Sequence, residues 1–583
     1  MFRVYGVSGG QHRLTTTCLL ALLLPAIAAH GDFSIRTVAV SGSPAPGTEL
    51  TTAFSGFYNA VVNRDGGVAF FGSLSGPDIV GTNAEGIWAE RGGMIELVVR
   101  ADDPAPGPVP GSIFHRFEYF QYDDQGNVMF HAVFRQPAQL PWPRSIWINR
   151  NGVTTLLART GDPCVGVSGY VYDNYFLPML LRDGIGYLYA STDTSPVGGG
   201  AGVWRTDGGP VSLVGHSGDP MPGIINGSLN GIGSVMLSEH QIVTLFGSSN
   251  VPSETPQYRA AIWSDRDGDL TLLLDGTDTP PGFDPAISFN LMGRPSVNRD
   301  GRLVFSTHLA GPGITEDNDQ TIWTDVDGEL DLVMREGDVA PCVDGGRRFC
   351  QVYAVAINDS GTIILRADSS LDCDSVDRVT GIWAANDGDL DCVMLSQQAV
   401  PDEAPGVVFK GAGATFVNNL GQIFFEGYVS GPGIDLTNDR GIWVVQPDGE
   451  IERVFRTGTL FDVDDDPLVE DLRTIDTYYI STSSNTSEGR STSVNDRGEV
   501  AFVLRFTDAS SGAFVARTLP IESCTTPGDL NADSLIDGRD IAGFVDCVIL
   551  QGGIGCACAD VDGNAVVDLA DLSSFSAALL SQS

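Results

Sequence analysis

Short runs of hydrophobic residues, broken by Gly, Asn and Asp, follow one another along almost the whole chain. The breaks take two forms, an Asn or Asp with Gly three residues later, and an Asp-Gly pair. Both favour tight turns, because these residues bond their own backbone or adopt positive φ angles. The runs after them, such as Val68 to Phe71 and Leu303 to Ser306, are rich in β-formers. The pattern therefore predicts short antiparallel strands, with helices almost absent from this part of the chain.

The strands and turns recur as degenerate copies of one unit, N-x-x-G-x-V-x-F, then G-I-W, then D-G, then R-x-G-D-x-x-P-G. Successive tryptophans of the unit are 57 to 60 residues apart, at Trp88, Trp147, Trp204, Trp263, Trp323, Trp383 and Trp443. Each copy supplies about four strands. Four-stranded units repeated end to end are typical of a β-propeller.

The two ends of the repeat region distinguish a closed ring from an open stack. Ser34 to Gly47 matches the back half of a unit, and Ser493 to Leu519 matches the front half. Together they complete an eighth unit and leave no free sheet edge. We predict an all-β fold, an eight-bladed β-propeller, with seven blades as the next alternative and a β-solenoid after that.

Residues 63–70 and 495–502 both read N-x-x-G-x-x-A-F. In this octet the chain resembles the bacterial tandem-repeat proteins named after that motif, a "choice-of-anchor" group of exported proteins with varied C-terminal anchors. The resemblance covers residues 33–519. It implies an exported repeat domain and no known reaction.

The chain divides into three segments. Arg3 and Arg13 precede the apolar run Leu19 to Leu24 and the small residues Ala26 to Ala29, which indicates a signal peptide at 1–29. The propeller is expected at 30–521 and a small C-terminal module at 522–583. No later segment is apolar enough to span a membrane, so we expect no transmembrane segment after signal cleavage and a secreted or cell-surface protein.

The formal charge of the full chain is −41, and Lys410 is its only lysine. A chain this acidic repels phosphate backbones, so nucleic acid is not an expected partner.

No zinc-protease, nucleophile-elbow or phosphate-loop motif is present. The Asp of the Gly-Asp pair recurs from blade to blade, at Asp162, Asp219 and Asp338, and turn structure explains such recurrence better than catalysis. The tryptophans are interpreted as core rather than as sugar-stacking platforms. Residues that depart from the repeat are interpreted as structural polar groups, namely His115, Arg116, Glu118, Glu239 and His240. The acidic insertion Phe461 to Thr492 is interpreted as a solvated loop, with cation binding as the alternative.

Cysteines suggest a local pattern of cross-links in an oxidising compartment. Cys342 and Cys350 bracket one loop, and Cys373 and Cys392 flank one Trp strand, so two short-range disulfide bonds are expected. Cys164 has no evident partner. Cys524, Cys547, Cys556 and Cys558 allow three pairings.

The C-terminal region contains two twelve-residue loops with oxygen-bearing residues at the spacing of an EF-hand calcium loop. The predicted Ca²⁺ ligands of the first loop are Asp529, Asn531, Asp533, Leu535, Asp537 and Asp540. Those of the second are Asp560, Asp562, Asn564, Val566, Asp568 and Asp571. Leu535 and Val566 would contribute backbone carbonyls. Each loop leads into an amphipathic helix, 541–550 and 572–580, and no helix precedes it.

These features, with the run Gly555-Cys556-Ala557-Cys558 before the second loop, resemble a GC-type or type I dockerin over residues 524–583. The resemblance implies two calcium sites and a cohesin-like or other surface receptor as partner. Ser534 and Ala565 replace the usual loop glycine, which weakens the expected affinity. A calcium-stabilised cap without a receptor is the alternative.

The sequence as a whole predicts a secreted, non-catalytic propeller that serves in binding or surface assembly and is anchored by a calcium-dependent dockerin-like module. Carbohydrate is a candidate ligand. The alternative is a polysaccharide-degrading enzyme, a glycoside hydrolase or lyase on a propeller scaffold, because dockerins often tether such domains. It would require two carboxylates unique to one or two blades and converging on the central funnel.

Overall fold

The structure is a computed structural model. It describes residues 33–518 with gaps at 108, 137–140, 194–198, 253–257, 374–376, 387, 465–468 and 482–488. In the C-terminal region it describes residues 526–530, 536, 538, 540–545, 547–548, 557–559, 561 and 571–581. The predicted signal peptide lies outside the described residues. No helix among them is long and apolar enough to cross a membrane.

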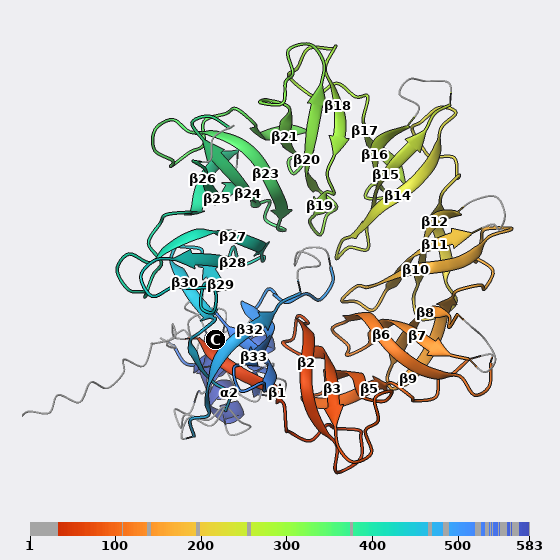
Figure 1. Cartoon of the computed structure of the whole chain (residues 1–583), viewed down its shortest axis with the longest axis vertical. Helices are drawn as coiled ribbons and strands as arrows, with labels where there is room; N and C mark the ends of the chain where they lie inside the picture. The colour runs from red at the N-terminus through yellow and green to blue at the C-terminus, as the bar shows by residue number, and fades with distance from the viewer. Residues whose placement is uncertain are drawn as a thin grey trace, which may run out of the picture.

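The described strands form eight antiparallel sheets arranged in a ring (Figure 1), so the prediction of eight blades is confirmed. Blade 1 contains β2 (Ala53–Val62), β3 (Val68–Ser75), β4 (Glu85–Arg91) and β5 (Met94–Arg100), and blade 2 contains β6 (Ile113–Tyr122), β7 (Val128–Arg135), β8 (Arg144–Arg150) and β9 (Val153–Arg159). Blade 3 contains β10 (Val171–Leu180), β11 (Gly186–Asp193), β12 (Gly199–Thr206) and β13 (Ser212–His216). Blade 4 contains β14 (Ser228–Leu237), β15 (Val243–Asn250), β16 (Tyr258–Ser264) and β17 (Thr271–Asp275).

Blades 5 to 7 continue the same order. Blade 5 contains β18 (Ser288–Met292), β19 (Ser296–Val297), β20 (Leu303–Ala310), β21 (Gln320–Thr324) and β22 (Asp331–Arg335). Blade 6 contains β23 (Arg348–Ile357), β24 (Ile363–Ser370), β25 (Val379–Asn386) and β26 (Asp389–Leu395). Blade 7 contains β27 (Val408–Val417), β28 (Ile423–Ser430), β29 (Arg440–Val445) and β30 (Ile451–Arg456).

Blade 8 closes the ring by joining the two ends of the repeat region. Its strand order is β1-β34-β33-β32-β31, comprising β1 (Ser34–Val40), β34 (Ser511–Arg517), β33 (Glu499–Phe506), β32 (Leu472–Tyr479) and β31 (Leu460–Asp462). The N-terminal strand β1 pairs with β34, with Ser34 opposite Arg517. The predicted completion of one unit by two partial copies is thereby confirmed.

The insertion 461–492 is more than a loop. It supplies β32, which occupies the place of the first strand in the other blades, and its far end reaches other blades. Thr492 pairs with Val62 of blade 1, and Arg490 pairs with Leu181 of blade 3. Figure 1 shows this part of the chain running from blade 8 toward the middle of the ring.

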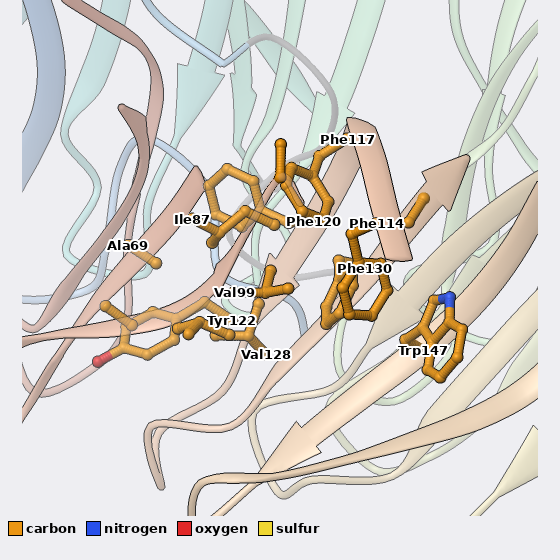
Figure 2. Close-up of a cluster of buried hydrophobic side chains, with 14 of the residues drawn as sticks. Ala69, Ile87, Val99, Phe114, Phe117, Phe120, Tyr122, Val128, Phe130 and Trp147 are labelled. Carbon is orange, nitrogen blue, oxygen red and sulfur yellow. The ribbon is translucent and has the colours of Figure 1, made fainter. Parts of the chain in front are cut away.

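The hydrophobic core is divided among the contacts between neighbouring blades, with one buried cluster at each. Figure 2 shows the cluster between blades 1 and 2, to which blade 1 contributes Ile87 and Val99. In blade 2, the rings of Phe114 and Trp147 meet edge to face, with centroids 5.0 Å apart. A chain of this length divides its core because one continuous core does not extend so far.

The two described α-helices are α1 (Asp540–Val545) and α2 (Asp571–Ser581). They share a small core in which the rings of Phe544 and Phe575 stack with centroids 4.0 Å apart. The parts of this region that the structure describes do not test the predicted dockerin-like module as a whole.

The four cysteines of blade 6 form two disulfide bonds, but not those that their order in the sequence suggested. Cys342 bonds Cys392 with Cα atoms 6.1 Å apart, and Cys350 bonds Cys373 with Cα atoms 5.3 Å apart. The expected pairing of adjacent cysteines was wrong because of strand register. Cys350, on β23, lies beside the loop after β24, since Arg348 pairs with Ser370.

Candidate functional site

The two C-terminal loops are the main site that the sequence predicts. The structure describes three of the predicted calcium ligands, Asp529, Asp540 and Asp571. The others lie outside the described residues: Asn531, Asp533, Leu535, Asp537, Asp560, Asp562, Asn564, Val566 and Asp568. Within the described ranges, no three His, Cys, Asp or Glu side chains are grouped closely enough to hold a metal ion. The calcium sites therefore stay a prediction.

Both loops are closed by the same hydrogen bond. The backbone N–H of Leu530 donates to Asp540 Oδ1, and that of Val561 donates to Asp571 Oδ1, each at 2.8 Å. Each bond joins the second residue of a loop to the twelfth, which is also the first residue of α1 or α2. Both carboxyl groups are fully buried, and Asp529 is 6% exposed. Carboxylate oxygens are the ligand type that the predicted calcium sites require.

The helices after the loops are also related to each other. Phe544 and Phe575 each stand four residues after the last Asp of their loop, and their rings are nearly parallel, with an interplanar angle of 6°. Gly528 N donates to Cys558 O at 2.7 Å, which ties together the segments just before the two loops. Cys547 and Cys558 are both disulfide-bonded. The described residues thus include two helices that begin with equivalent hydrogen bonds and pack against each other through one aromatic ring each.

In the propeller, the Asn of the N-x-x-G turn has a structural role. Asn63 Oδ1 accepts the backbone N–H groups of Asp65 and Gly67 at 3.1 and 2.8 Å, which fixes the turn. Its Nδ2 donates to Asp123 O of the next blade at 3.1 Å. The same bond between blades is made by Asn358, Asn418 and Asn495, at 3.1, 3.2 and 2.9 Å. An amide satisfies both needs because it is acceptor and donor at once.

Blade 2 has Asp123 in place of this Asn. Its carboxylate accepts the backbone N–H groups of Gln125 and Asn127 and the side-chain amide of Asn127, at 2.7 to 3.0 Å. Burial nevertheless dominates and raises the pKa of Asp123 to about 6. The carboxyl group has no proton to donate to blade 3 when it is ionised.

The aspartates of the Gly-Asp pairs hold turns, as expected from their recurrence. Asp219 Oδ2 accepts His216 N at 2.8 Å, and Asp338 Oδ2 accepts Arg335 N at 3.1 Å. Asp162 Oδ1 accepts from Arg159 Nε at 3.1 Å. These carboxylates stabilise the turns in the segments that lead from one blade to the next.

All seven repeat tryptophans are less than 2% exposed, so their interpretation as core is confirmed. Several indoles also fix the loop that leads into their blade. Trp88 Nε1 donates to Pro46 O at 3.0 Å, and Trp204 Nε1 donates to Val165 O at 2.8 Å. None of these rings offers a face to a ligand.

Most of the residues that depart from the repeat are held by other charges. Glu118 is paired with Arg116 and Arg144. Its Oε2 lies 3.2 Å from Nδ1 of His131, whose pKa burial lowers to about 4, so that this ring is neutral. Glu239 is paired with Arg64, and His240 Nδ1 lies 3.0 Å from Asp300 Oδ1. His115 packs against Trp142 with ring centroids 4.6 Å apart, while its Nδ1 is buried without a hydrogen-bond partner.

In the described part of the acidic insertion, the side chain of Asp462 bonds to backbone N–H groups of the insertion itself. Asp462 Oδ1 accepts the N–H groups of Asp464 and Asp471 at 3.2 and 3.0 Å, and the Asp471 carboxylate is paired with Arg473. Asp465 and Asp466 lie outside the described residues.

A cavity of about 360 Å³ between blades 6 and 7 was not anticipated from the sequence. We call it the blade 6–7 groove, and it is lined by Tyr353, Arg366, Asp368, Thr380, Lys410, Gly411, Ala412, Tyr428 and Asp439. The lining strands are β23, β24 and β25 of blade 6 and β27 and β28 of blade 7. The available signal was that Lys410 is the only lysine of the chain.

One similar solved structure is the β-propeller domain of the Trilobed protease from Pyrococcus furiosus, with 10% identity and a TM-score of 0.33 over 69% of this chain and 98% of that chain. A second is an oligogalacturonate lyase in complex with manganese, with 12% identity and a TM-score of 0.33 over 70% of this chain and 98% of that chain. A third is the acylaminoacyl peptidase of Pyrococcus horikoshii, with 10% identity and a TM-score of 0.34 over 78% of this chain and 57% of that chain. No curated protein matches the chain closely enough to count as a relative. A model described as "Family of unknown function (DUF7453)" matches residues 25–340 and 324–525, and because these ranges cover most of the chain, the protein belongs to that family.

Proposed function

We propose that this protein is an exported, non-catalytic binding or surface-assembly propeller, and that its C-terminal region is a calcium-dependent docking module. The observation that carries the proposal is the identical closure of the two loops, by Leu530 N to Asp540 and by Val561 N to Asp571. Each of these buried carboxylates stands at position 12 of its loop, where an EF-hand-type loop supplies an oxygen ligand to Ca²⁺. We expect one calcium ion in each loop.

The way in which the propeller uses its repeated polar residues supports a non-catalytic role. The recurring Asn, Asp and Trp side chains form turns, bonds between blades and core, as described above. At the turns near the ring axis, Asp359 and Asp496 accept the backbone N–H groups of Arg299 and Asn419 at 2.8 and 2.9 Å. These two carboxylates are therefore engaged in joining blades.

Export is the third part of the proposal. The sequence of residues 1–29 has the form of a signal peptide, and blade 6 contains two disulfide bonds. Structural disulfide bonds persist in oxidising compartments. The partner of the docking module would then be a cohesin-like or other receptor protein outside the cytoplasm.

Calorimetric titration of the mature full-length chain with Ca²⁺, after treatment with a chelator, tests the docking module. We expect two bound ions, and one fewer in each of the variants Asp540→Asn and Asp571→Asn. Asp508→Asn, at an exposed turn of the propeller, is the matched control and should keep both sites. Absence of calcium binding to the folded wild-type chain would refute the proposal.

A further inference from the structure

The blade 6–7 groove contains two positive groups that lack a carboxylate partner. Arg366 Nη1 donates to Ala412 O at 2.6 Å, and its Nε is buried without a hydrogen-bond partner. Lys410 is exposed, and in the described part of the chain no hydrogen bond or ion pair involves its ammonium group. In a chain with a formal charge of −41, two cations in the lining of one groove, neither paired with a carboxylate, favour an anionic ligand.

The buried carboxylate in the lining, Asp368, has partners other than Arg366 and Lys410. Asp368 is 5% exposed. It accepts hydrogen bonds from Tyr353 Oη and Thr380 Oγ1, both at 2.6 Å, and lies 3.4 Å from Arg378 Nη1. The carboxylate thereby fixes the orientation of the Tyr353 ring and the Thr380 hydroxyl.

Two tyrosines provide flat surface in the groove. Tyr353 is 44% exposed, and the Arg366 guanidinium lies over its ring, 5.0 Å from the centroid. Tyr428 Oη donates to Glu426 Oε2 at 3.0 Å. Burial and the neighbouring carboxylates raise the pKa of both phenols, so they are neutral. An exposed aromatic ring with hydroxyl and carboxylate groups at its edge suits a ring that carries hydroxyl groups of its own.

The combination is specific to this pair of blades. Arg366 is the fourth residue of β24, and the fourth residue of β3 and of β15 is Phe71 and Phe246. Lys410 is the third residue of β27, where β14 has Asn230. The groove therefore departs from the repeat at the places where two neighbouring blades meet, which is how a binding site on a repeated scaffold should differ from its surroundings.

We propose that the blade 6–7 groove binds an acidic saccharide through a uronic acid unit. The sugar carboxylate would bind Arg366 and Lys410, the pyranose ring would lie against Tyr353, and Asp439 and Thr380 would bond its hydroxyl groups. A cavity of about 360 Å³ is at the small end of ligand sites, which fits one or two sugar units. The inference rests on the proposed binding role of the propeller but not on the calcium module.

The test is binding of D-glucuronic and D-galacturonic acid to the full-length protein, measured by saturation-transfer NMR and calorimetry. Glucose, galactose and inorganic phosphate serve as comparison probes. We expect saturable binding of a uronic acid that is weakened about tenfold or more in Lys410→Gln, since a charge-assisted bond is lost. Lys410→Arg should retain binding, and Arg299→Gln, which removes a positive charge at the turn between β19 and β20, should have no effect.

Arg366→Gln should also weaken binding, but it removes the bond to Ala412. The exposed Lys410 is therefore the deciding variant. Equal binding of the neutral sugars, equal binding of phosphate, or no effect of Lys410→Gln would overturn the proposal. All measurements are repeated in EDTA, where uronate binding should persist, and its loss would likewise overturn the proposal. Failure of calcium binding alone would refute the docking module and leave this result standing.

Discussion

Replacing Asp123 by Asn should stabilise the propeller at neutral pH. Asp123 is fully buried, and burial raises the pKa of its carboxyl group from 3.8 to about 6. Below pH ~4 the group is protonated in both the folded and the unfolded chain and does not affect stability. Between pH ~4 and ~6 the unfolded chain releases its proton first, so the carboxyl group progressively destabilises the fold. The full penalty applies above pH ~6.

The size of the effect follows from this difference of about two pKa units, each equivalent to about 1.4 kcal/mol, which sets an upper limit of about 3 kcal/mol. Asparagine does not titrate, and it can donate across to blade 3 as Asn63 donates to Asp123 O. The side-chain amide of Asn127 can turn so that its bond to residue 123 is kept. We expect a gain of about 1 to 3 kcal/mol at pH 7.5, or about 1 to 3 °C in Tm for a domain of this size.

Thermal and urea unfolding of wild type and Asp123→Asn between pH 4 and 8 measures the effect. The two proteins should have similar stability at pH 4 and should separate as the pH rises to 6. Asn63→Asp, the reverse change in blade 1, should be less stable than wild type at pH 7.5 and closer to it at pH 4. A stability difference of Asp123→Asn that is unfavourable at pH 7.5, or that does not vary with pH, would refute the reasoning.

Three further changes test the fold. Removing the Cys342–Cys392 bond by double Ser substitution should cost about 4 kcal/mol in urea unfolding, given its 50-residue separation, and an unchanged midpoint would contradict this. Gly427→Ala should lower stability by about 1 to 3 kcal/mol, because a Cβ there would lie 2.6 Å from the Trp443 ring; a neutral result would mean that the ring moves freely. A chain that begins after residue 40 lacks β1, exposes the edge of β34 and should self-associate in light scattering, whereas a monomer with unaltered Tm would argue against ring closure by this strand.

The fold could be predicted from the sequence because its determinants are local and repeated. The Asn63 turn and the buried Trp88 each appear in nearly every unit, so one interpretation accounts for the whole ring. The partial units at the two chain ends indicated closure, and the pairing of β1 with β34 confirms it. The insertion after blade 7 carried no repeat signature, so neither strand β32 within it nor the pairing of Arg490 with blade 3 could be predicted.

The groove and the disulfide pairing were not predictable because both depend on which strands lie side by side. Arg366 and Lys410 belong to different blades, and nothing in their spacing brings them together without the register between blades. Cys350 and Cys373 meet because the start of β23 lies beside the end of β24. The sequence order suggested bonds between cysteines that follow each other along the chain, whereas strand pairing brought together Cys350 and Cys373.

Hydrogen exchange of the full-length chain, measured by mass spectrometry with and without Ca²⁺, tests most directly whether the C-terminal region is a calcium-dependent docking module. The amides of Leu530 and Val561, which close the two loops, and those of α1 and α2 should become strongly protected when calcium is added. Propeller amides should not change. Equal exchange of the C-terminal region with and without calcium would contradict the account.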